Sequence, residues 1–300
     1  RGLGDVYKRQ SLVHDGLQRQ YLIYLPSSYQ ENTSYPLVIN FHGFGGQINE
    51  YSSYADMRSL ADSENFILVY PQGENLNGSP HWNAALMGGN NKSDIDDLGF
   101  IESLILKLSS QNIINSDRVY MVGYSNGGMM SYAMACHKSN LVAAIASISG
   151  TMLYISNCEP NRSIPLLNIH GTEDPTLPYN GNNYYNSVDD ALNFWNTNNN
   201  SDPSPNTTLL NTNLNNIQFF GFSNSDNISV DHYKIINVDI TYVGQVPKLM
   251  PYRELIRKNL STTLGIDIEN ISCKATTTDG LGFEGKLEGI SCHCVVLIDK

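Results

Sequence analysis

The sequence predicts an α/β protein, in which a mostly parallel sheet is covered by helices and a small α+β segment follows at the C-terminal end. Across residues 22–236, short apolar runs alternate with longer amphipathic stretches, which is the pattern of strands joined by covering helices. A Gly-x-Ser-x-Gly pentapeptide at residues 123–127 lies between an apolar run and an amphipathic stretch. After Asn237 the pattern begins again with one strand, one helix and two strands, which predicts the small α+β segment at the C-terminal end.

Seven apolar runs are the candidate strands of the large sheet. They are YLIYLP (21–26), PLVINF (36–41), FILVYP (66–71), RVYMVG (118–123), AAIASISG (143–150), PLLNIH (165–170) and VDHYKII (230–236). Between the third and fourth runs, an apolar stripe at helical spacing predicts a helix packed on the sheet, formed by Phe100, Ile101, Leu104, Ile105 and Leu108. Residues 193–216 hold ten asparagines, and we interpret them as a surface insertion that forms no core element.

The C-terminal cycle is predicted from four segments: VDITYVG (238–244), PYRELIRKNLSTTLG (251–265), NISCKATTT (270–278) and GISCHCVVLI (289–298). No linker separates this cycle from the preceding strand, so the joint falls inside a strand. At the other end, DVYKRQ (5–10) resembles the translation of a sequencing adapter. We therefore expect three parts, residues 1–10, 11–237 and 238–300.

Composition and charge limit the possible partners. Hydrophobic residues make up 41% of the 300 residues, enough for one large core or two smaller ones. No run of eighteen apolar residues occurs, and the N-terminus lacks a charged-then-apolar secretory pattern, so we expect neither a membrane span nor a visible signal peptide. A formal net charge of -11 disfavours nucleic acid and anionic membranes as partners, and a neutral or sugar-like substrate fits better.

The five cysteines are Cys136, Cys158, Cys273, Cys292 and Cys294. Their number is odd and no Cys-x-x-Cys spacing occurs, so the sequence does not support a zinc ribbon or a thioredoxin motif. Cys136 and Cys158 either form a disulfide or remain two buried thiols.

The pentapeptide around Ser125 has the context that a nucleophile requires. It follows a strand directly and precedes a helix directly, as in a nucleophile elbow. Glycines are needed because side chains at those positions would collide with neighbouring backbone, and the strained turn raises the Ser125 hydroxyl above the sheet edge. The alternative is a plain glycine-rich turn.

An attacked ester carbonyl becomes an oxyanion that backbone N–H groups must stabilise. Asn126, the residue after the nucleophile, would supply one N–H, and Phe44 in the FHGFGG turn would supply the other. His42 opens that turn, and we expect it to hold the loop rather than to act as a base.

The acid partner is expected in a loop after a later strand. Asp174 lies just past PLLNIH, and serine before aspartate is the chain order of such sites. Glu173 would point the opposite way. We interpret His170 as a packed residue at the strand end.

Residues 17–237 resemble the poly(3-hydroxybutyrate) depolymerase and feruloyl esterase family of α/β-hydrolases, through the motifs RQYLIYLP, PLVINFHGFGG, FILVYPQG, HWN, DIDDLGF, RVYMVGYSNGGMMSYAMAC, AAIASISG, IHGTEDPTLPYNG and HYKIIN. The resemblance implies an α/β-hydrolase sheet and a secreted or periplasmic serine esterase that acts on hydroxyacyl or hydroxycinnamoyl esters without a cofactor. It also implies Ser125 as nucleophile, Asp174 as acid and Trp82 near the substrate mouth. From residue types alone, Trp82 could equally be core or ordinary surface. Cys136 and Cys158 match positions that can be bridged in relatives.

The histidine of that family is missing. In the family, the strand corresponding to HYKIIN continues into a Gly-Gly-His turn, whereas here Asn237 is followed by Val238, Asp239 and Ile240. From there to Lys300 the chain resembles the C-terminal portion of methylerythritol cyclodiphosphate synthase, a cytoplasmic enzyme of isoprenoid synthesis, through NVDITYVGQVPKL and KATTTDGLGFEGKLEGI.

The second resemblance implies a partial nucleotide site. Lys248 and Leu249 would line a base pocket, while Thr276, Thr277 and Asp279 would meet phosphates or their metal ion. Asp279 replaces the usual Glu, and Lys286 stands where an Arg is usual, which loses bidentate phosphate geometry. Nothing matches the half of the synthase that carries its metal ligands, so a divalent metal is expected only if that half were complete. The resemblance also implies trimer contacts and apolar surface in the tail. From residue types alone, KATTTD is a structural strand end.

We interpret the chain as a chimera in which each part lacks the rest of its active site. His232 lies early in the strand whose far end should carry the base, roughly 16 Å short of that end. His293 lies in the tail. We therefore expect ester hydrolysis barely above background.

Overall fold

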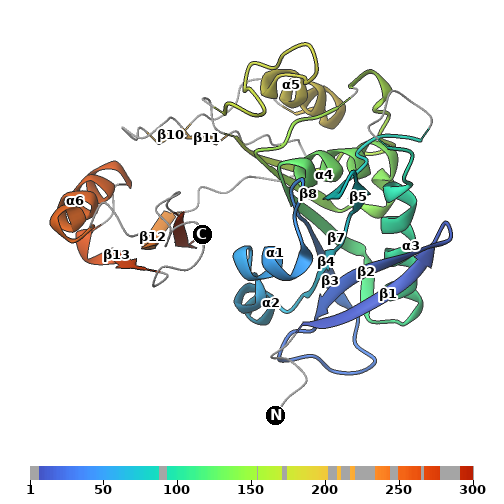
Figure 1. Cartoon of the computed structure of the whole chain (residues 1–300), viewed down its shortest axis with the longest axis horizontal. Coiled ribbons are helices and arrows are strands. Elements are labelled where there is room, and N and C mark those ends of the chain that lie inside the picture. The colour runs from blue at the N-terminus through green and yellow to red at the C-terminus, as the bar shows by residue number, and fades with distance from the viewer. Residues whose placement is uncertain are drawn as a thin grey trace. The chain divides into compact units, whose positions relative to one another are not determined.

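The computed structural model describes residues 7–87, 93–153, 155–170, 174–201, 208–210, 217–219, 234–243, 249–264, 267–277 and 291–299. Contacts divide the chain into two compact units (Figure 1). The first unit comprises Arg1–Leu209 with Ile217–Ser229, and the second comprises Leu210–Asn216 with Val230–Lys300. In the described part of the chain, no helix combines the length and the apolar character needed to cross a membrane.

The first unit is built on a seven-stranded sheet. In spatial order its strands are β1 (Lys8–His14), β2 (Leu17–Tyr24), β4 (Ile67–Pro71), β3 (Tyr35–Phe41), β7 (Ile114–Tyr124), β8 (Ala144–Ile148) and β9 (Leu166–Ile169). The pairs from β4 to β9 are parallel, while β1–β2 and β2–β4 are antiparallel. The predicted mostly parallel sheet is therefore confirmed. Strand β1 was not predicted, and it includes Lys8, Arg9 and Gln10 of the adapter-like segment.

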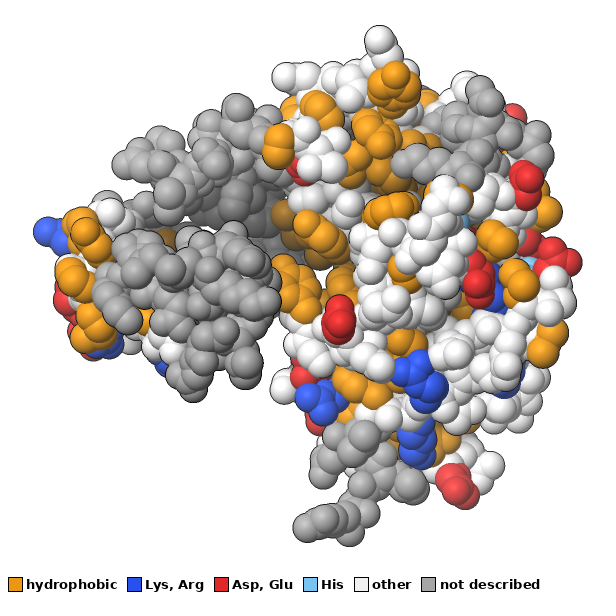
Figure 2. Space-filling view, in the orientation of Figure 1, with side chains coloured by type: hydrophobic (Ala, Val, Ile, Leu, Met, Phe, Trp, Pro, Cys, Tyr) orange, Lys and Arg blue, Asp and Glu red, His pale blue; other side chains and the backbone are white. Residues whose placement is uncertain are grey.

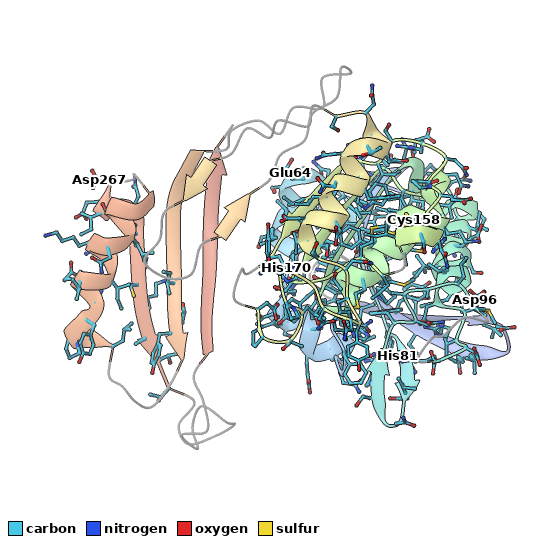
Figure 3. The ribbon with its side chains drawn as sticks, turned by 90° about the horizontal axis from the view of Figure 1, so that it is seen from above. Glu64, His81, Asp96, Cys158, His170 and Asp267 are labelled. Carbon is cyan, nitrogen blue, oxygen red and sulfur yellow. A yellow bond between two sulfur atoms is a disulfide. The ribbon has the colours of Figure 1, made fainter. Side chains whose placement is uncertain are left out.

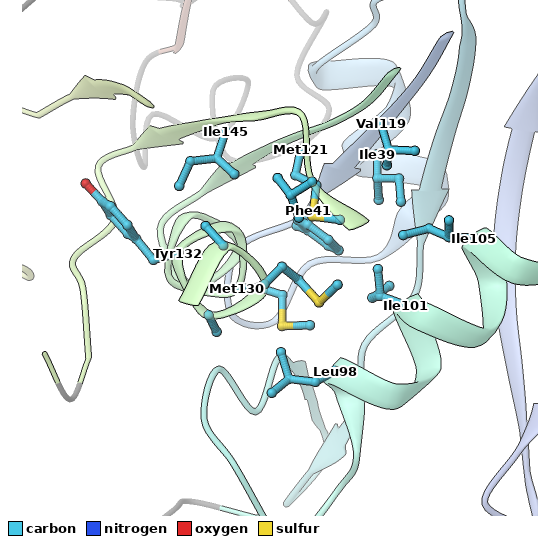
Figure 4. Packing of buried hydrophobic residues seen from close by; sticks show 14 of the residues in the cluster. Ile39, Phe41, Leu98, Ile101, Ile105, Val119, Met121, Met130, Tyr132 and Ile145 are labelled. Atoms are coloured by element: carbon cyan, nitrogen blue, oxygen red, sulfur yellow. The ribbon is translucent and has the colours of Figure 1, made fainter. Parts of the chain in front are cut away.

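Helices cover this sheet and close its core. They are α1 (Ile48–Tyr54), α2 (Arg58–Glu64), α3 (Asp97–Ser110), α4 (Asn126–His137) and α5 (Val188–Asn199), with short helical turns η1 (Ser139–Leu141) and η2 (Ile155–Asn157). The apolar stripe predicted on α3 is buried in full. Figure 4 shows Ile101 and Ile105 of α3 and Met130 of α4 facing strand residues such as Ile39 and Val119. On the face seen in Figure 2, positive and negative side chains of this unit lie interspersed among uncharged ones.

Helix α5 corrects the interpretation of residues 193–216 as a surface insertion without a core element. A capping box begins this helix. The Ser187 side-chain hydroxyl accepts the N–H of Asp190 at 3.0 Å, and the Asp190 carboxylate accepts the N–H of Ser187 at 3.3 Å. The helix buries Val188, Ala191, Leu192 and Trp195, which recur at helical spacing. Capping and this stripe outweigh the poor helix propensity of its asparagines.

Cys136 and Cys158 form a disulfide, with the two sulfur atoms 1.99 Å apart and the two Cα atoms 4.7 Å apart. The bond joins the last turn of α4 to the segment after η2. It resolves the choice between a bridge and two thiols that the sequence left open. The hairpin of β5 (Glu74–Leu76) with β6 (Ser79–His81) and the two-stranded sheet of β10 (Thr208–Leu210) with β11 (Ile217–Phe219) are the other described strands of this region.

The second unit has the predicted strand, helix and two strands. Its sheet has the order β13 (Ile271–Thr276), β12 (Lys234–Val243) and β14 (Ser291–Asp299), and it is accompanied by α6 (Arg253–Leu264), η3 (Met250–Tyr252) and η4 (Ile268–Asn270). Met250, Tyr252 and Leu255 are exposed large apolar side chains, as expected for the tail.

The expectation that residues 230–236 form a strand of the large sheet is wrong for their described part. From Lys234 onward this segment belongs to β12, in which Lys234 pairs with Asp299 and Val238 with Val296. The strand continues through the expected joint at residues 237 and 238, with one irregularity between Ile235 and Asn237. Pairing with β14 therefore takes residues 234–237 into the sheet of the second unit.

Candidate active site

Ser125 lies at the sharp turn between β7 and α4, as predicted. Its φ is 53° and its ψ is -117°, a left-handed backbone that costs a non-glycine residue conformational energy. The turn is held from one side because the Ser125 N–H donates to the Ile148 carbonyl at 2.8 Å. Such strain at a partly exposed serine is the geometry of a nucleophile elbow.

Two glycines are required for this turn. A Cβ on Gly123 would lie 2.1 Å from the Gly127 carbonyl oxygen, and a Cβ on Gly127 would lie 2.2 Å from the Phe41 carbonyl oxygen. Both distances are far below van der Waals contact. The sequence therefore forms this tight strand-to-helix packing only with glycine at both positions.

The loop after β3 lies against the nucleophile. A Cβ built on Gly43 would be 3.5 Å from the Ser125 Cβ. The Gly45 N–H donates to Pro80 and the Gly46 N–H to Gly43, at 2.7 and 3.0 Å, whereas the Phe44 N–H has no acceptor among the described residues. Asn126 is the first residue of α4, so its N–H has no intrahelical acceptor. Both N–H groups can serve an oxyanion, and that role stays a prediction.

His42 holds this loop and is not positioned to act as a base. Its Nδ1 donates to the Gly43 carbonyl at 2.7 Å, while its Nε2 accepts the Gly73 N–H and the Gln72 amide, each at 3.0 Å. Burial lowers the pKa of His42 to about 4. The ring is therefore neutral near pH 7 and both of its nitrogens are occupied.

Trp82 lies next to the site but beneath the loop. Only 2% of its surface is exposed, and its indole N–H donates to the His42 carbonyl at 3.0 Å. Its backbone N–H and carbonyl bond to the Asn126 side chain at 2.7 and 3.0 Å. The indole thus supports the loop and the start of α4. Contact with a substrate stays a prediction.

Asp174 follows β9, and Ser125 follows β7. Both strands are parallel to β8, so both residues follow the carboxyl edge of the sheet. One Asp174 carboxylate oxygen accepts the N–H groups of Thr176 and Leu177 at 2.8 and 2.9 Å. These bonds fix the carboxylate in its turn, and its role as triad acid stays a prediction. Glu173 lies outside the described residues.

His170 is packed at the end of β9, as predicted, and Figure 3 labels it on this unit. Its Nδ1 lies 3.2 Å from the Gly150 carbonyl oxygen and its Nε2 lies 2.7 Å from the Leu177 carbonyl oxygen. The Asp174 carboxylate is 3.7 Å from Nε2. The ring therefore connects the Asp174 turn to the segment after β8.

The structure provides Ser125 with no base among the described residues. His14 bonds to Ser103 and Asp96, and His81 bonds to Glu74 and Ser93. His137 has no hydrogen bond to Ser125, and burial lowers its pKa. His232 lies outside the described residues, and the His293 backbone belongs to β14 of the second unit.

Three features of the site were missed in the sequence. Gln72 fixes both His42 and Gly46, the latter at 3.0 Å, and its signal is the YPQG motif at the end of β4. The Asn126 side chain, inside the GYSNG motif, holds Trp82. Phe44 and Tyr124 expose 55% and 44% of their surfaces beside the nucleophile, which their positions flanking Gly43 and Ser125 could have indicated.

The predicted nucleotide-binding residues of the second unit are described only in part. Leu249 precedes η3, Thr276 ends β13, and Thr277 follows it. Lys248 and Asp279 lie outside the described residues. Within the described residues, no group of three or more His, Cys, Asp or Glu side chains could hold a metal ion.

The sequence pattern of the family described as Phospholipase/Carboxylesterase matches residues 28–220. The bifunctional acetylxylan esterase/xylanase XynS20E of Neocallimastix patriciarum is 31% identical over 173 residues, which are 58% of this chain and 23% of that protein. Feruloyl esterase B of Piromyces equi is 28% identical over 167 residues, which are 54% of this chain and 30% of that protein.

The pattern of the YgbB family matches residues 223–299. Over 68 residues the chain is 50% identical to 2-C-methyl-D-erythritol 2,4-cyclodiphosphate synthase of Syntrophomonas wolfei subsp. wolfei, covering 23% of this chain and 43% of that protein. The chain thus spans less than half the length of each of these relatives. The two family matches do not overlap, which confirms the chimeric composition, and the second begins upstream of the boundary expected at residue 238.

Proposed function

Because the chain belongs to the phospholipase/carboxylesterase family, we propose that its first unit is built to hydrolyse carboxylic esters with Ser125 as the nucleophile. The observation that carries this proposal is the left-handed Ser125 at the β7–α4 turn, directly against the Gly43 loop. Attack by the Ser125 hydroxyl on an ester carbonyl would form an oxyanion that the N–H groups of Phe44 and Asn126 stabilise. This chemistry uses only groups of the protein and needs no cofactor.

The chain as it stands would perform this reaction poorly. A serine hydroxyl is a weak nucleophile until an adjacent base takes its proton. Asp174 would orient that base, but the family's Gly-Gly-His turn is replaced by Val238, Asp239 and Ile240. His42 cannot substitute, since both of its ring nitrogens are engaged in holding the loop.

The substrate is proposed to be a small or polymeric ester with an apolar acyl group. Phe44 is a half-exposed aromatic side chain within the oxyanion loop, and Tyr124 is a half-exposed aromatic side chain directly before the nucleophile. Their apolar faces favour a hydroxycinnamoyl or a longer hydroxyacyl group over acetyl, because acetyl offers little apolar area to bury.

The esterase part is proposed to be secreted or periplasmic. The Cys136–Cys158 disulfide supports this location, because such bonds form and persist in oxidising compartments and are rare in the cytoplasm.

The proposal is tested with p-nitrophenyl butyrate and methyl ferulate. We expect the unmodified chain to hydrolyse both barely above background, because loss of the histidine from a comparable triad costs on the order of a millionfold in turnover. Replacing the chain from Val238 onward with a relative's Gly-Gly-His segment and the rest of its domain should restore turnover, and Ser125→Ala should then abolish it. Robust turnover by the unmodified chain that is lost in Ser125→Ala would show that another histidine acts as the base.

A second candidate function rests on the 50% identity of the C-terminal segment to a cyclodiphosphate synthase. We propose that the second unit is an incomplete piece of such a cytoplasmic enzyme. Lys248 and Leu249 would belong to its base pocket, and Thr276, Thr277 and Asp279 would contact phosphates or a divalent metal. The proposal of missing trimer contacts is supported by three exposed apolar side chains, Met250, Tyr252 and Leu255. Titration calorimetry with cytidine diphosphate and Mg²⁺ should show no binding tighter than about 1 mM, and tighter binding would contradict the proposed incompleteness.

A further inference from the structure

The described part of the first unit contains four Asn-x-Ser/Thr tripeptides, the acceptor sequence for N-linked glycans in secreted proteins. Their asparagines are Asn32, Asn77, Asn161 and Asn199. The tripeptide alone does not decide whether a glycan is present, because the folded chain must leave room for a bulky, hydrated saccharide. The surroundings of the four asparagines differ, and they separate acceptors from non-acceptors.

Asn161 lies in the loop between η2 and β9, and residues 161–163 are all exposed. The backbone of this loop is held in place, because the Asn161 N–H donates to the hydroxyl of the buried Ser139 at 2.9 Å. The Asn161 side-chain amide and the Ser163 hydroxyl have no hydrogen bond to another described residue. The loop therefore presents to solvent both groups that an oligosaccharyltransferase requires, and a glycan would break no internal contact.

Asn32 has similar surroundings in the turn before β3, where residues 32–34 are exposed. Its φ is 62°, a left-handed conformation that asparagine adopts more readily than most residues. The side chains of Asn32 and Ser34 also have no hydrogen bond to another described residue. This position too can carry a saccharide without loss of a contact.

Asn32 and Asn161 lie at the edge of the sheet opposite the nucleophile. Strands β3, β7, β8 and β9 are parallel. Asn32 precedes β3 and Asn161 precedes β9, so both lie at the amino edge, whereas Ser125 follows β7 at the carboxyl edge. Glycans on these two asparagines would therefore leave the approach to Ser125 open.

The other two tripeptides are excluded by their surroundings. Asn199 is 8% exposed, its Oδ1 accepts the Ile164 N–H at 2.9 Å, and its Nδ2 donates to the Ile164 carbonyl at 2.8 Å. A sugar on Nδ2 would have to break this pair of bonds. Asn77 is exposed, but Pro80 directly follows its tripeptide and restricts the backbone of Ser79, whose hydroxyl the transferase would need.

We propose that Asn161 and Asn32 carry N-linked glycans. In the transfer, the side-chain nitrogen bonds to the anomeric carbon of an oligosaccharide carried on a lipid pyrophosphate. The bond from that carbon to the pyrophosphate oxygen breaks, the lipid pyrophosphate leaves with the electron pair, and the amide proton passes to a base of the transferase. The proposal rests on the secreted location proposed above, which the Cys136–Cys158 disulfide supports, and not on the ester chemistry.

The experiment maps glycans on the full chain, expressed behind a cleavable secretion signal in insect cells. Protein from the medium and from the microsomal fraction is collected, so that retained chain is analysed as well. Enzymatic removal of N-glycans in heavy-oxygen water leaves a labelled aspartate at each former acceptor, and mass spectrometry of the peptides locates it. We expect the label at positions 161 and 32 and none at Asn199.

Matched variants test the acceptor hydroxyls. Ser163→Ala and Ser34→Ala destroy one tripeptide each, whereas Ser163→Thr and Ser34→Thr preserve it. Each alanine variant should lose the mass of one glycan, and each threonine variant should keep it. Both serines are exposed, so the fold should tolerate all four changes.

An unlabelled Asn161 or Asn32 in the parent chain would overturn the proposal. A labelled Asn199 would also overturn it, because exposure would then not distinguish the acceptors. None of these outcomes bears on the esterase proposal, since ester hydrolysis is measured separately.

Discussion

His42 is a histidine near the nucleophile whose ring holds the oxyanion loop in place instead of acting as a base. Its Nε2 accepts the N–H of Gly73, which follows β4, and its Nδ1 donates to the carbonyl of Gly43 in the oxyanion loop. The Trp82 indole then bonds to the His42 carbonyl, and the Asn126 amide bonds to the Trp82 backbone. A continuous set of hydrogen bonds thus joins the loop after β3 to the first turn of α4, so the two proposed oxyanion donors are positioned together.

The state of His42 predicts a pH dependence of stability. Its pKa is about 4 in the folded chain and 6.5 when unfolded, because burial disfavours the charged ring. Above pH 6.5 both states are neutral and the contribution is constant. As the pH falls from 6.5 to 4, the unfolded state takes up the proton first, so the free energy of unfolding falls by about 3 kcal/mol.

The measurement is urea unfolding of the first unit at several pH values between 7 and 4.5. His42→Asn keeps a donor for the Gly43 carbonyl but cannot titrate. We expect this variant to be less stable at pH 7 and to lose less stability than the parent as the pH falls. Parallel pH profiles for the two proteins would show that His42 is not the buried neutral group described.

The Asn126 side chain gives a second residue-scale prediction. Asn126→Ala removes both hydrogen bonds to the Trp82 backbone and leaves a partly buried donor and acceptor unsatisfied. We expect the free energy of unfolding to fall by about 1–3 kcal/mol. Asn193→Ala, at an exposed position of α5, should change it by less than about 0.5 kcal/mol. Equal effects of the two substitutions in urea unfolding would contradict the bracing role of Asn126.

At the scale of elements, α5 shows how a buried apolar stripe can outweigh the low helix propensity of an asparagine-rich sequence. Trp195 is 1% exposed in this helix, and its indole N–H has no acceptor among the described residues. Trp195→Ala should cost about 3–5 kcal/mol of unfolding free energy, because it leaves a large cavity. Trp195→Phe should cost much less, since it keeps most of the ring and removes the unsatisfied N–H. Thermal unfolding of the first unit would measure both, and equal losses would show that the indole N–H has a partner.

The elements that sequence reasoning identified correctly are those with a long local pattern. The stripe of α3 and the strand–turn–helix around Ser125 are local in sequence, so spacing alone determined them. Strand β1 was missed because its first three residues, 8–10, lie in the adapter-like segment. Helix α5 was missed because its asparagines hid the stripe at Val188, Ala191 and Trp195.

The sequence predicted the site residues that lie in local motifs but not the hydrogen bonds between distant segments. Motif residues such as Ser125 and Asp174 are identified by their place after a strand. The partners of His42 and Asn126 could not be read from the sequence, because Gln72 lies 30 residues from His42 and Trp82 lies 44 residues from Asn126 in the chain. Hydrogen bonds of that separation depend on strand order.

For the whole molecule, the decisive element is β12. Its ten residues cross the joint expected at residues 237 and 238, yet all of its described pairings are with β13 and β14. The last residues of the esterase motif therefore serve the sheet of the second unit. The elbow, the oxyanion loop and the Asp174 turn form without them, because their hydrogen bonds and packing are internal to the first unit.

Because contacts divide the chain into two units, each with its own buried residues, we predict two separate unfolding transitions. The Cys136–Cys158 bond closes a 22-residue separation within the first unit. Cys136→Ala with Cys158→Ala should lower the stability of that unit by about 3 kcal/mol, which corresponds to about 6–12 °C in its Tm.

The reciprocal variant is Cys273→Ala. Cys273 is 3% exposed in β13, so its truncation should lower only the transition of the second unit. Differential scanning calorimetry of the three proteins separates the outcomes, because each substitution should move one transition and leave the other in place. If both transitions moved together in either variant, the chain would unfold as one cooperative body, and the joint within β12 would couple the two sheets mechanically.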